Sequence, residues 1–436
     1  MSFGWTTPAI PRNPLPGGPD ASEDRMSGTK GTGAPVRRAA GRSALLGAVF
    51  LMATSAIGPG FITQTTEFTA TLGAAFAFAI VVSILIDIAV QLNLWRVIGV
   101  AGRRAQELAE QVLPGAGYLL AALVVFGGLV FNVGNVAGTA LGLDALAGID
   151  VKIGGAVSAL IAVGIFASKR AGIAMDRIII ALGVVMIAMT LYAAFASNPP
   201  VGEAMRNAVL PEELGSPMFV AIVTVVGGTV GGYITYAGAH RLLDSGITGP
   251  ENVKEITRAS VTGIIVTGVM RVVLFLAVLG VVAGGVSLAG LDNAPAAAFQ
   301  HAAGEFGLRL FGVIMWAAAI SSVIGASYTS VSFVTSFHPW LERNRSWLVA
   351  GFIVISAALY LMLGQAPAQL LIMAGALNGL ILPIGFAIML WVAARRRDLL
   401  NGYRYPRWLL ALGVAAWLVS VYIAWQALSG LSALWS

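Results

Sequence analysis

The sequence has no cysteine, three histidines and few charged residues, which are 11% of its 436 residues. Soluble domains carry roughly 25% charged residues. The lack of cysteine excludes disulfides and thiolate metal sites, and three histidines argue against a His-rich metal centre. The sequence also contains no recognisable nucleophile–base pair and no Gly-rich nucleotide loop followed by Lys. It therefore predicts neither an enzyme nor a bound cofactor.

What is abundant points to a membrane protein. Hydrophobic residues make up 58% of the chain, and its 53 glycines are typical of closely packed membrane helices. Residues 1–41 differ, because they are rich in Pro, Gly, Ser and charge and have almost no apolar periodicity. We expect them to form a disordered cytoplasmic tail, followed by a single transmembrane domain over residues 42–436.

Apolar runs long enough to cross a bilayer recur along the rest of the chain. A spanning helix needs about 20 apolar residues, and backbone groups in lipid need internal partners, so helices are the expected structure. The sequence predicts an all-α fold of about eleven transmembrane helices. They cover approximately residues 44–72, 75–100, 116–140, 153–168, 177–196, 217–245, 259–284, 308–336, 346–363, 368–393 and 408–429.

The distribution of basic residues supports this count. With the N-terminus inside, Lys152, Arg206 and Arg309 fall outside and Arg271 falls within a span, whereas the rest of the 26 Lys and Arg lie on the inside. Lys and Arg concentrate in cytoplasmic loops of membrane proteins. We therefore expect a multi-pass protein of the plasma (inner) membrane, with a cytoplasmic N-terminus and an outside C-terminus. The net charge of +6 then reflects membrane orientation, and no nucleic-acid partner is expected.

Two spans contain helix breakers near their middles. Span one carries Gly58-Pro59-Gly60-Phe61, and span six carries Gly227-Gly228-Thr229-Val230-Gly231-Gly232-Tyr233. Proline and paired glycines weaken a helical ladder. Breaks five spans apart are typical of an inverted repeat, in which discontinuous helices bind a solute at the midplane. The simpler interpretation is that these glycines only permit close helix packing.

Several further motifs match one transporter family. Between Leu46 and Gly102 the family pattern can be laid on this sequence without a gap. The matching positions are Leu46, Gly47, Phe50, Leu72-Gly73, Gln91, Arg96, Gly102-Arg103-Arg104, Glu107-Leu108-Ala109-Glu110, Gly227 to Val230, Ser321, Ser322, Leu382 and Pro383. Over about residues 44–394 the chain thus resembles the NRAMP family of divalent metal transporters. The resemblance implies a LeuT-type 5+5 inverted repeat with discontinuous helices one and six. The repeats would cover residues 44–196 and 217–393, with an extra helix at 408–429.

The family's functional side chains do not carry over. Its Asp-Pro-Gly-Asn motif falls on Gly58-Pro59-Gly60-Phe61, and its Met-Pro-His motif falls on Gly231-Gly232-Tyr233. A metal-binding glutamine of helix ten falls near Gly375, and an acidic pair used for proton passage falls on Asn132 and Asn135. Matching Gly58-Pro59-Gly60 instead to the family's helix-one opening requires a deletion of about a dozen residues, so we favour the gapless register.

The remaining site lacks negative charge. A divalent cation at the midplane without a carboxylate is costly, whereas helix N-termini offer free N–H groups and a partial positive potential. We therefore expect a secondary transporter that carries a small anion, such as bicarbonate or a short carboxylate, by alternating access. The predicted binding residues are Gly58, Gly60, Phe61, Gln64, Asn132, Asn135, Gly231, Gly232 and Tyr233. The alternatives are a transporter of divalent cations such as Mg²⁺ or Mn²⁺, and a membrane sensor. The sensor is less expected, because no output domain follows the last span. The oligomeric state stays open.

Glu67, Asp87 and Arg271 are charged residues expected within the membrane. Asp87 and Arg271 are candidates for ion coupling or for an ion pair between helices, with a structural or interfacial role as the simpler interpretation. Glu67 lies about two turns beyond the first break, where it is either a coupling-ion ligand with Thr63 or Gln64, or a solvated charge at the outer rim; we favour the rim. His240, Arg241 and Asp244 are expected to form an interfacial cluster and helix cap.

Overall fold

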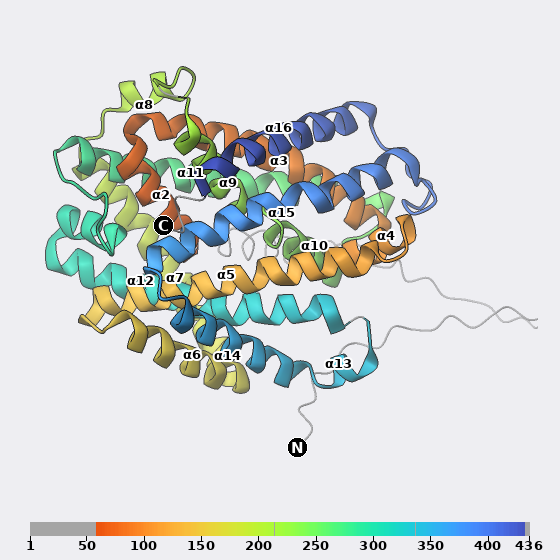
Figure 1. The fold of residues 1–436 in the computed structure, drawn as a ribbon, viewed down its shortest axis with the longest axis horizontal. Helices are drawn as coiled ribbons and strands as arrows, with labels where there is room; N and C mark the ends of the chain where they lie inside the picture. Colours follow the sequence, from red (N-terminus) through yellow and green to blue (C-terminus); the bar gives the residue numbers. More distant parts are fainter. Residues whose placement is uncertain (1–57, 213, 336, 432–436) are drawn as a thin grey trace, which may run out of the picture. The chain divides into compact units, whose positions relative to one another are not determined.

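The structure is a computed structural model that describes residues 58–212, 214–335 and 337–431, without the side chains of 169–180 and 428–431. All regular secondary structure in these ranges is helical (Figure 1). The helices are α2 (Pro59–Leu72), η1 (Gly73–Ala75), α3 (Phe76–Ala101), α4 (Ala105–Val112), α5 (Ala116–Ala147), α6 (Val151–Ala167), α7 (Lys169–Ala196), α8 (Val201–Asn207), α9 (Ser216–Thr229), α10 (Ile234–Asp244), η2 (Pro250–Asn252), α11 (Val253–Ala283), α12 (Ala294–Thr335), α13 (Pro339–Arg343), α14 (Arg345–Leu363), α15 (Pro367–Arg395) and α16 (Arg407–Leu431).

Every predicted span from residue 75 onwards coincides with one helix or with the pair α9 and α10. The largest difference concerns α12, which begins at Ala294 instead of residue 308. Two residues within it are not helical: Ala303 has φ −138° and Gly304 has φ 63° and ψ −156°. The second conformation is one that essentially only glycine adopts, so the chain bends there. The predicted tail at residues 1–41, and residues 44–57 of the first span, lie outside the described residues.

The length and apolar character of the helices support a membrane fold. In the described residues eight helices can cross a membrane, or nine if the bent pair Ala181–Ala196 and Val201–Asn207 counts as one span. One of the eight is the run Pro59–Ala101, which contains parts of two predicted spans, and Val151–Ala167 is a shorter apolar helix. The all-helical membrane class is confirmed, while the count of eleven stays a prediction.

Loops predicted on the same side of the membrane contact each other. On the predicted inner side, Arg396 Nη1 donates to the carbonyl oxygen of Gln111 at 2.6 Å. On the predicted outer side, Arg309 Nη1 donates to the carbonyl oxygen of Leu146 at 2.8 Å. These contacts join segments 285 and 163 residues apart in the sequence. The structure thus groups these loops as the charge pattern predicts, and which group faces the cytoplasm stays a prediction.

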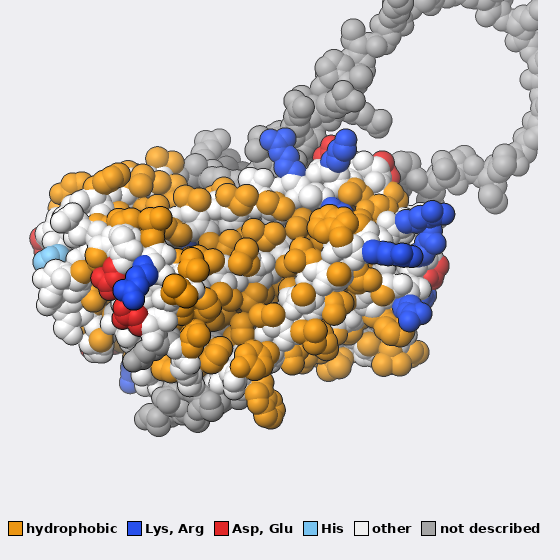
Figure 2. Space-filling view, turned by 90° about the horizontal axis from the view of Figure 1, so that it is seen from above, with side chains coloured by type: hydrophobic (Ala, Val, Ile, Leu, Met, Phe, Trp, Pro, Cys, Tyr) orange, Lys and Arg blue, Asp and Glu red, His pale blue; other side chains and the backbone are white. Residues whose placement is uncertain are grey.

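The surface has the pattern expected of a protein surrounded by lipid. Large hydrophobic side chains are exposed on several helices, among them Phe195 (84%), Trp347 (81%) and Met362 (79%). Figure 2 shows hydrophobic side chains over the middle of the visible face and charged side chains towards its two ends. An exposed apolar belt of this extent marks a membrane-embedded surface.

The interior is organised around α5, which packs against α2, α6, α12, α14 and α15. Small residues let these helices approach closely. A methyl group at Gly138 would lie 2.3 Å from Pro59 of α2, and one at Gly142 would lie 2.5 Å from the Trp316 backbone of α12. Such small-residue contacts are a usual basis of helix association in membranes.

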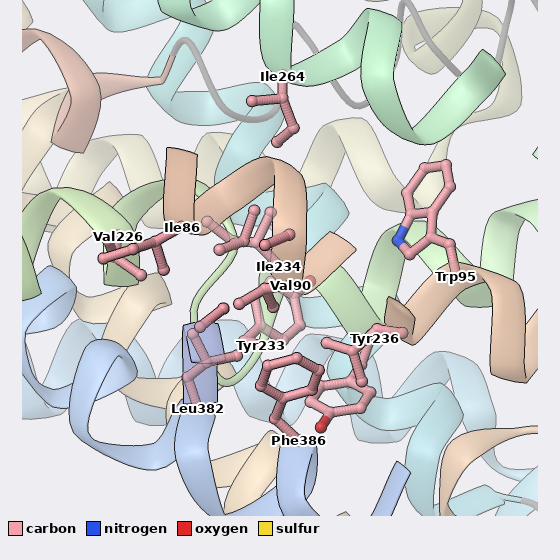
Figure 3. Packing of buried hydrophobic residues seen from close by; sticks show 14 of the residues in the cluster. Ile86, Val90, Trp95, Val226, Tyr233, Ile234, Tyr236, Ile264, Leu382 and Phe386 are labelled. Atoms are coloured by element: carbon pink, nitrogen blue, oxygen red, sulfur yellow. The ribbon is translucent and has the colours of Figure 1, made fainter. Parts of the chain in front are cut away.

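A second layer of packing joins α3, the two halves of span six and α15. Figure 3 shows that residues from all of these helices meet, among them Val90 of α3, Tyr236 of α10 and Phe386 of α15. Trp95 is fully buried on α3 and donates from its indole nitrogen to the Thr235 carbonyl at 3.0 Å. The halves of span six are therefore held by the surrounding helices even though they are not continuous with each other.

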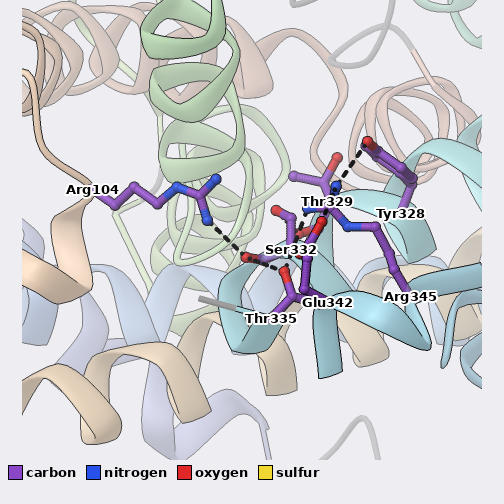
Figure 4. Close-up of polar contacts among 7 residues, drawn as sticks. All are labelled: Arg104, Tyr328, Thr329, Ser332, Thr335, Glu342 and Arg345. Atoms are coloured by element: carbon purple, nitrogen blue, oxygen red, sulfur yellow. Dashed lines mark hydrogen bonds and ion pairs between the residues drawn. The ribbon is translucent and has the colours of Figure 1, made fainter. Parts of the chain in front are cut away.

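A basic cluster ties down the C-terminal end of α12 (Figure 4). Arg104, which follows α3, donates to the Ser332 carbonyl at 3.1 Å. Arg345 donates to the Tyr328 hydroxyl at 3.3 Å and pairs with Glu342 at 3.3 Å. The predicted inner ends of α3, α12 and α14 are thus joined by arginine side chains.

The approach of α9 to α15 generates a testable prediction. A methyl group at Gly227 would lie 1.8 Å from the Gly375 carbonyl oxygen and 2.4 Å from the Gly379 backbone nitrogen. Because both neighbours are backbone atoms, Gly227→Ala must push the helices apart. Overpacking of this kind costs about 1–3 kcal/mol or more. We expect a clear loss of melting temperature in detergent.

Gly351 of α14 is the matched control, since it is also a helical glycine but has nothing within 4 Å of an added methyl group. Gly351→Ala should leave the melting temperature unchanged or raise it, because alanine favours helix. Equal stability of the two variants would contradict the described packing of α9 on α15.

Candidate functional site

The predicted interruption of span six is confirmed. Helix α9 ends at Thr229, α10 begins at Ile234, and Val230 and Tyr233 have φ values of −122° and −115° as the flanking cap residues. Within the break, the Gly232 N–H donates to the Asn378 carbonyl of α15 at 2.8 Å. One backbone amide of the unwound segment is thus satisfied by the neighbouring helix and is not available to a solute.

The glycines of this break are required for packing. A methyl group at Gly231 would lie 2.2 Å from the Gly227 carbonyl oxygen, and one at Gly232 would lie 2.5 Å from Ile381. The packing interpretation of these glycines therefore has direct structural support. These glycines also bring α15 close to the break, so the packing role is compatible with a binding role for the same segment.

The described part of span one begins at the predicted breakers. Gly58 is the N-cap of α2 with extended backbone (φ −95°, ψ −172°), and Pro59 occupies the first turn. Gly58 has no side chain to cap this N-terminus, and Gly58, Gly60 and Phe61 are all buried. Because the first N–H groups of a helix have no intrahelical acceptor, Gly60 and Phe61 present amides at this buried end. The break itself involves residues before 58, so it stays a prediction.

Gln64 joins the three helices that surround the breaks. Its side chain is fully buried, and its Nε2 donates to the Leu371 carbonyl of α15 at 3.0 Å. Methyl groups at Gly228 of α9 and Gly375 of α15 would lie 2.4 Å and 2.5 Å from its amide atoms. These two glycines therefore form a cradle for Gln64, whose Oε1 has no hydrogen-bond partner.

Tyr233 and Asn378 lie beside the unwound segment. The Tyr233 hydroxyl donates to the Ala326 carbonyl of α12 at 3.3 Å, and its ring lies 5.9 Å from that of Phe131. The Asn378 Nδ2 donates to the Gly127 carbonyl of α5 at 3.0 Å, while its Oδ1 has no partner. The phenol and this amide thus link the break to α12 and α5.

The two asparagines predicted from helix three are buried on α5. Asn132 Nδ2 donates to the Ser327 hydroxyl of α12 at 2.9 Å and to the Ser356 hydroxyl of α14 at 3.0 Å. Asn135 is 1% exposed, and its Nδ2 has no partner. The hydrogen bonds of Asn132 thus run to α12 and α14, and none of them reaches α2 or α10.

A buried pair of opposite charges lies at the C-terminal end of α9. Asp87 of α3 and Arg271 of α11 line one small pocket together with Thr229, and exposure is 2% for Asp87 and 3% for Arg271. Arg271 Nη2 donates to the Thr229 hydroxyl at 3.2 Å, and the Asp87 side chain also interacts with Thr229. Among the described residues, no ion pair of 4.0 Å or less joins the two charges directly. Arg271 and Asp87 thus both contact the side chain of Thr229, whose hydroxyl itself donates to the Val225 carbonyl at 2.8 Å.

Arg271 also connects this pair to span one. Its guanidinium carbon lies 4.5 Å from the centre of the Phe61 ring, within the range of a cation–π contact. Phe61 belongs to the first turn of α2, and Thr229 is the last residue of α9. One cationic side chain thus contacts both predicted break regions, and its Nη1 has no partner.

Glu67 follows Gln64 by three positions on α2. It is partly buried, and one carboxylate oxygen is shielded without a hydrogen-bond partner. The neighbouring Thr63 is fully buried, and its hydroxyl likewise has no partner. This environment is drier than that of a fully solvated rim charge.

His240 differs from its expected role in a surface cluster. It is 3% exposed and stacks on Phe333 of α12, with ring centres 3.9 Å apart. His240 lies on the face of α10 that packs against the bundle. The sequence of this short, polar helix end gives little indication of which of its faces is buried.

The contributions of Thr229 and Asn378 were not predicted. Each is a polar residue inside an apolar run, which is a general sign of a functional or packing contact in a membrane helix. Arg271 was predicted only as a coupling or ion-pair candidate, with a structural or interfacial role as the simpler interpretation. Its contact with Phe61 depends on how α11 is rotated against α2, which the sequence does not indicate.

Metal ligands are sparse in the described part of the chain. No group of three or more His, Asp or Glu side chains within the described ranges could hold a metal ion. The groups at the site are one buried guanidinium, the Asp87 carboxyl beside it, helix N-terminal amides and neutral hydroxyl and amide groups.

Similar structures share the fold. The crystal structure of the Eremococcus coleocola manganese transporter in complex with an aromatic bis-isothiourea substituted compound aligns with a TM-score of 0.67 and 17% identity, covering 93% of this chain and 89% of that one. The crystal structure of MhsT in complex with L-phenylalanine aligns with a TM-score of 0.63 and 17% identity, covering 88% and 98%. At this identity the likeness shows the LeuT-type fold alone.

Sequence relatives are much closer. The uncharacterized membrane protein YcsG of Bacillus subtilis is 51% identical over 401 residues, which are 92% of this chain and 98% of that protein. An uncharacterized membrane protein of Haemophilus influenzae is 52% identical over 383 residues, covering 88% and 94%. Residues 49–429 match the family described as natural resistance-associated macrophage protein-like, or Nramp. The chain therefore belongs to the Nramp family of membrane transporters.

Proposed function

We propose that this protein is a secondary transporter that carries a small anion, such as bicarbonate or a short carboxylate, by alternating access. The observation that carries the proposal is Arg271, a buried guanidinium that contacts both Phe61 of α2 and Thr229 of α9 and keeps one donor nitrogen unpartnered. We place the transporter in the plasma membrane with its N-terminus in the cytoplasm, as the basic loops indicate.

Electrostatics favour an anion beside Arg271. The uncapped N-terminus of α2 adds a partial positive charge, which stabilises anions near a helix start. Phe61 lies in that first turn and under the guanidinium, so the two positive features are close neighbours. A carboxylate or bicarbonate between them would accept hydrogen bonds from the free Nη1 and from backbone amides.

A divalent cation is the second candidate, because the Eremococcus coleocola relative is a manganese transporter. In this chain the positions matched to the family's metal ligands are Gly58, Phe61 and Gly231, none of which carries a ligand side chain. The anion therefore suits the available groups better.

The first prediction concerns the charge of Arg271. Arg271→Gln alone would leave Asp87 buried without its counter-charge, which costs about 3–5 kcal/mol. The double variant Asp87→Asn with Arg271→Gln removes both charges and should fold. We expect its uptake of radiolabelled bicarbonate, formate and pyruvate into proteoliposomes to fall about 10- to 100-fold, since charged hydrogen bonds contribute about 1.5–3 kcal/mol.

Arg309→Gln is the matched control, since it makes the same substitution at an exposed arginine paired with Glu305. Its uptake should equal that of the wild type. Full uptake by a folded double variant would show that the anion does not bind at Arg271.

The second prediction uses the N-cap of α2. Gly58 has an extended backbone that any residue adopts, and Asp is a favoured N-cap residue. Gly58→Asp should therefore fold, yet place a negative charge at the proposed anion site. At about 4 Å and an effective dielectric near 20 the repulsion is about 4 kcal/mol, so anion uptake should be lost. Gly58→Asn has nearly the same shape without the charge and should retain more uptake; equal uptake by the two variants would place the solute elsewhere.

The third prediction concerns transition metals. Because the matched positions offer no sulfur, imidazole or carboxylate ligand, the purified protein should bind Mn²⁺ poorly. Isothermal titration measures this directly. A saturable dissociation constant of about micromolar size, or tighter, would favour the metal candidate over the anion.

A further inference from the structure

The buried charges at the end of α9 are incompletely satisfied. Arg271 Nη1 and Asp87 Oδ1 both lack a hydrogen-bond partner, although each residue is almost fully buried. Thr229 lies between the two groups and takes up one donor of the guanidinium. A structural ion pair is normally closed by direct contact and by saturation of the remaining donors and acceptors. This pair leaves one donor and one acceptor free beside a small pocket.

We propose that Asp87 and Arg271 couple transport to protons: when an anion binds Arg271, Asp87 takes up one proton, so that one proton crosses the membrane with each anion. The inference rests on the proposed function, in which Arg271 binds the transported anion. It adds the identity of the coupling ion and of the residue that carries it.

Charge balance at the buried site is the physical reason. Without substrate, the guanidinium and the Asp87 carboxylate offset each other. An anion at Arg271 leaves a net charge of −1 in a region where unpaired charge is costly. A proton from water that forms an O–H bond on Asp87 restores neutrality, and no bond of the anion is broken. When the anion leaves on the other side, the carboxylate is again the counter-charge of Arg271 and releases its proton there.

The surroundings of Asp87 favour this residue as the proton acceptor. The groups that face its carboxyl are Arg271 from α11 and the Thr229 hydroxyl from α9, and Ser83 and Thr267 line the same pocket. On α3 itself, Arg96 is bound to Thr257 more than two turns away. The other charged or titratable side chains on the helices packed against α3 are Glu67 on α2, Glu203 and Arg206 on α8, Tyr236, His240, Arg241 and Asp244 on α10, Glu251 on η2, Lys254, Glu255 and Arg258 on α11, Arg395 on α15, and Arg407 and Tyr422 on α16.

Among these, Arg271 is the charged group that acts on the Asp87 carboxyl. Binding of an anion to Arg271 therefore changes the electrostatic environment of Asp87 directly. No other charged side chain is placed to compensate for it in the described surroundings of this carboxyl.

The experiment counts protons on anion binding to the full-length protein. Sodium formate and sodium pyruvate are the probes, because both stay ionised from about pH 5.5 to about pH 8. Isothermal titration is repeated in buffers of different ionisation enthalpy, and the slope of the observed heat against that enthalpy gives the protons taken up per anion. We expect about one proton for the wild type, and a dissociation constant that rises about tenfold per pH unit while free Asp87 is ionised.

Two variants identify the residue. Asp87→Asn should take up no proton, and its dissociation constant should not depend on pH. Glu67→Gln makes the same change of charge at an acidic side chain on α2, a helix that also packs against α3, and it should keep the proton count of the wild type. Loss of proton uptake in Glu67→Gln with retention in Asp87→Asn would overturn the assignment to Asp87.

The outcomes separate this inference from the proposed function. If neither probe binds the wild type saturably, the proposed anion function fails. If a probe binds and no proton is taken up, the anion function stands and the coupling inference is wrong. The proton count is measured on the wild-type protein. The coupling inference can therefore be tested even if Asp87→Asn does not fold.

Discussion

An unwound backbone inside a membrane protein must find its hydrogen-bond partners within the protein. Here that partner is α15, which accepts a hydrogen bond from the Gly232 amide at 2.8 Å. The approach requires glycine on both sides, since Gly227 of α9 faces the backbone of Gly375 and Gly379. This contact therefore helps to fix the position of the break in span six and the orientation of the residues that flank it.

The flanking residues contact two further helices. Thr229, the last residue of α9, accepts a hydrogen bond from Arg271 of α11, and Tyr233, at the start of α10, donates to the Ala326 carbonyl of α12. The break is thus connected to both α11 and α12. A change in its geometry would alter the surroundings of Arg271 and the contact with α12 together. This is the kind of linkage that alternating access requires, because the site must be remade as the helices move.

The sequence predicted the helices well and the site less well. Spans were predictable because the need to cross an apolar layer sets helix length and composition, and the Gly-Gly pairs around Thr229 indicated the break in α9 and α10. The start of α12 differs because a helical segment from Ala294 precedes the bend at Ala303 and Gly304, whereas the predicted start at residue 308 lies just beyond that bend. The role of Arg271 was harder to predict, since a contact with Phe61 depends on the rotation of two helices that are distant in sequence. Asn132 was assigned to the site from its place in span three, whereas its hydrogen bonds run to α12 and α14.

Gln64 shows why position-by-position comparison is incomplete at such a site. The family resemblance implies a glutamine near Gly375 on span ten, and by that comparison the amide is simply missing. In the structure, Gln64 reaches across from α2, and its amide nitrogen lies 2.5 Å from where a side chain at Gly375 would begin. An amide therefore occupies this region, although it comes from a different helix. The absence of a side chain at Gly375 is what makes room for it, so the two positions form one packing unit. The chemistry around the breaks has to be judged from the groups that lie there in space. These include the Gln64 amide, the Arg271 guanidinium and the Asp87 carboxyl, but no cluster of three or more carboxylate or histidine side chains among the described residues.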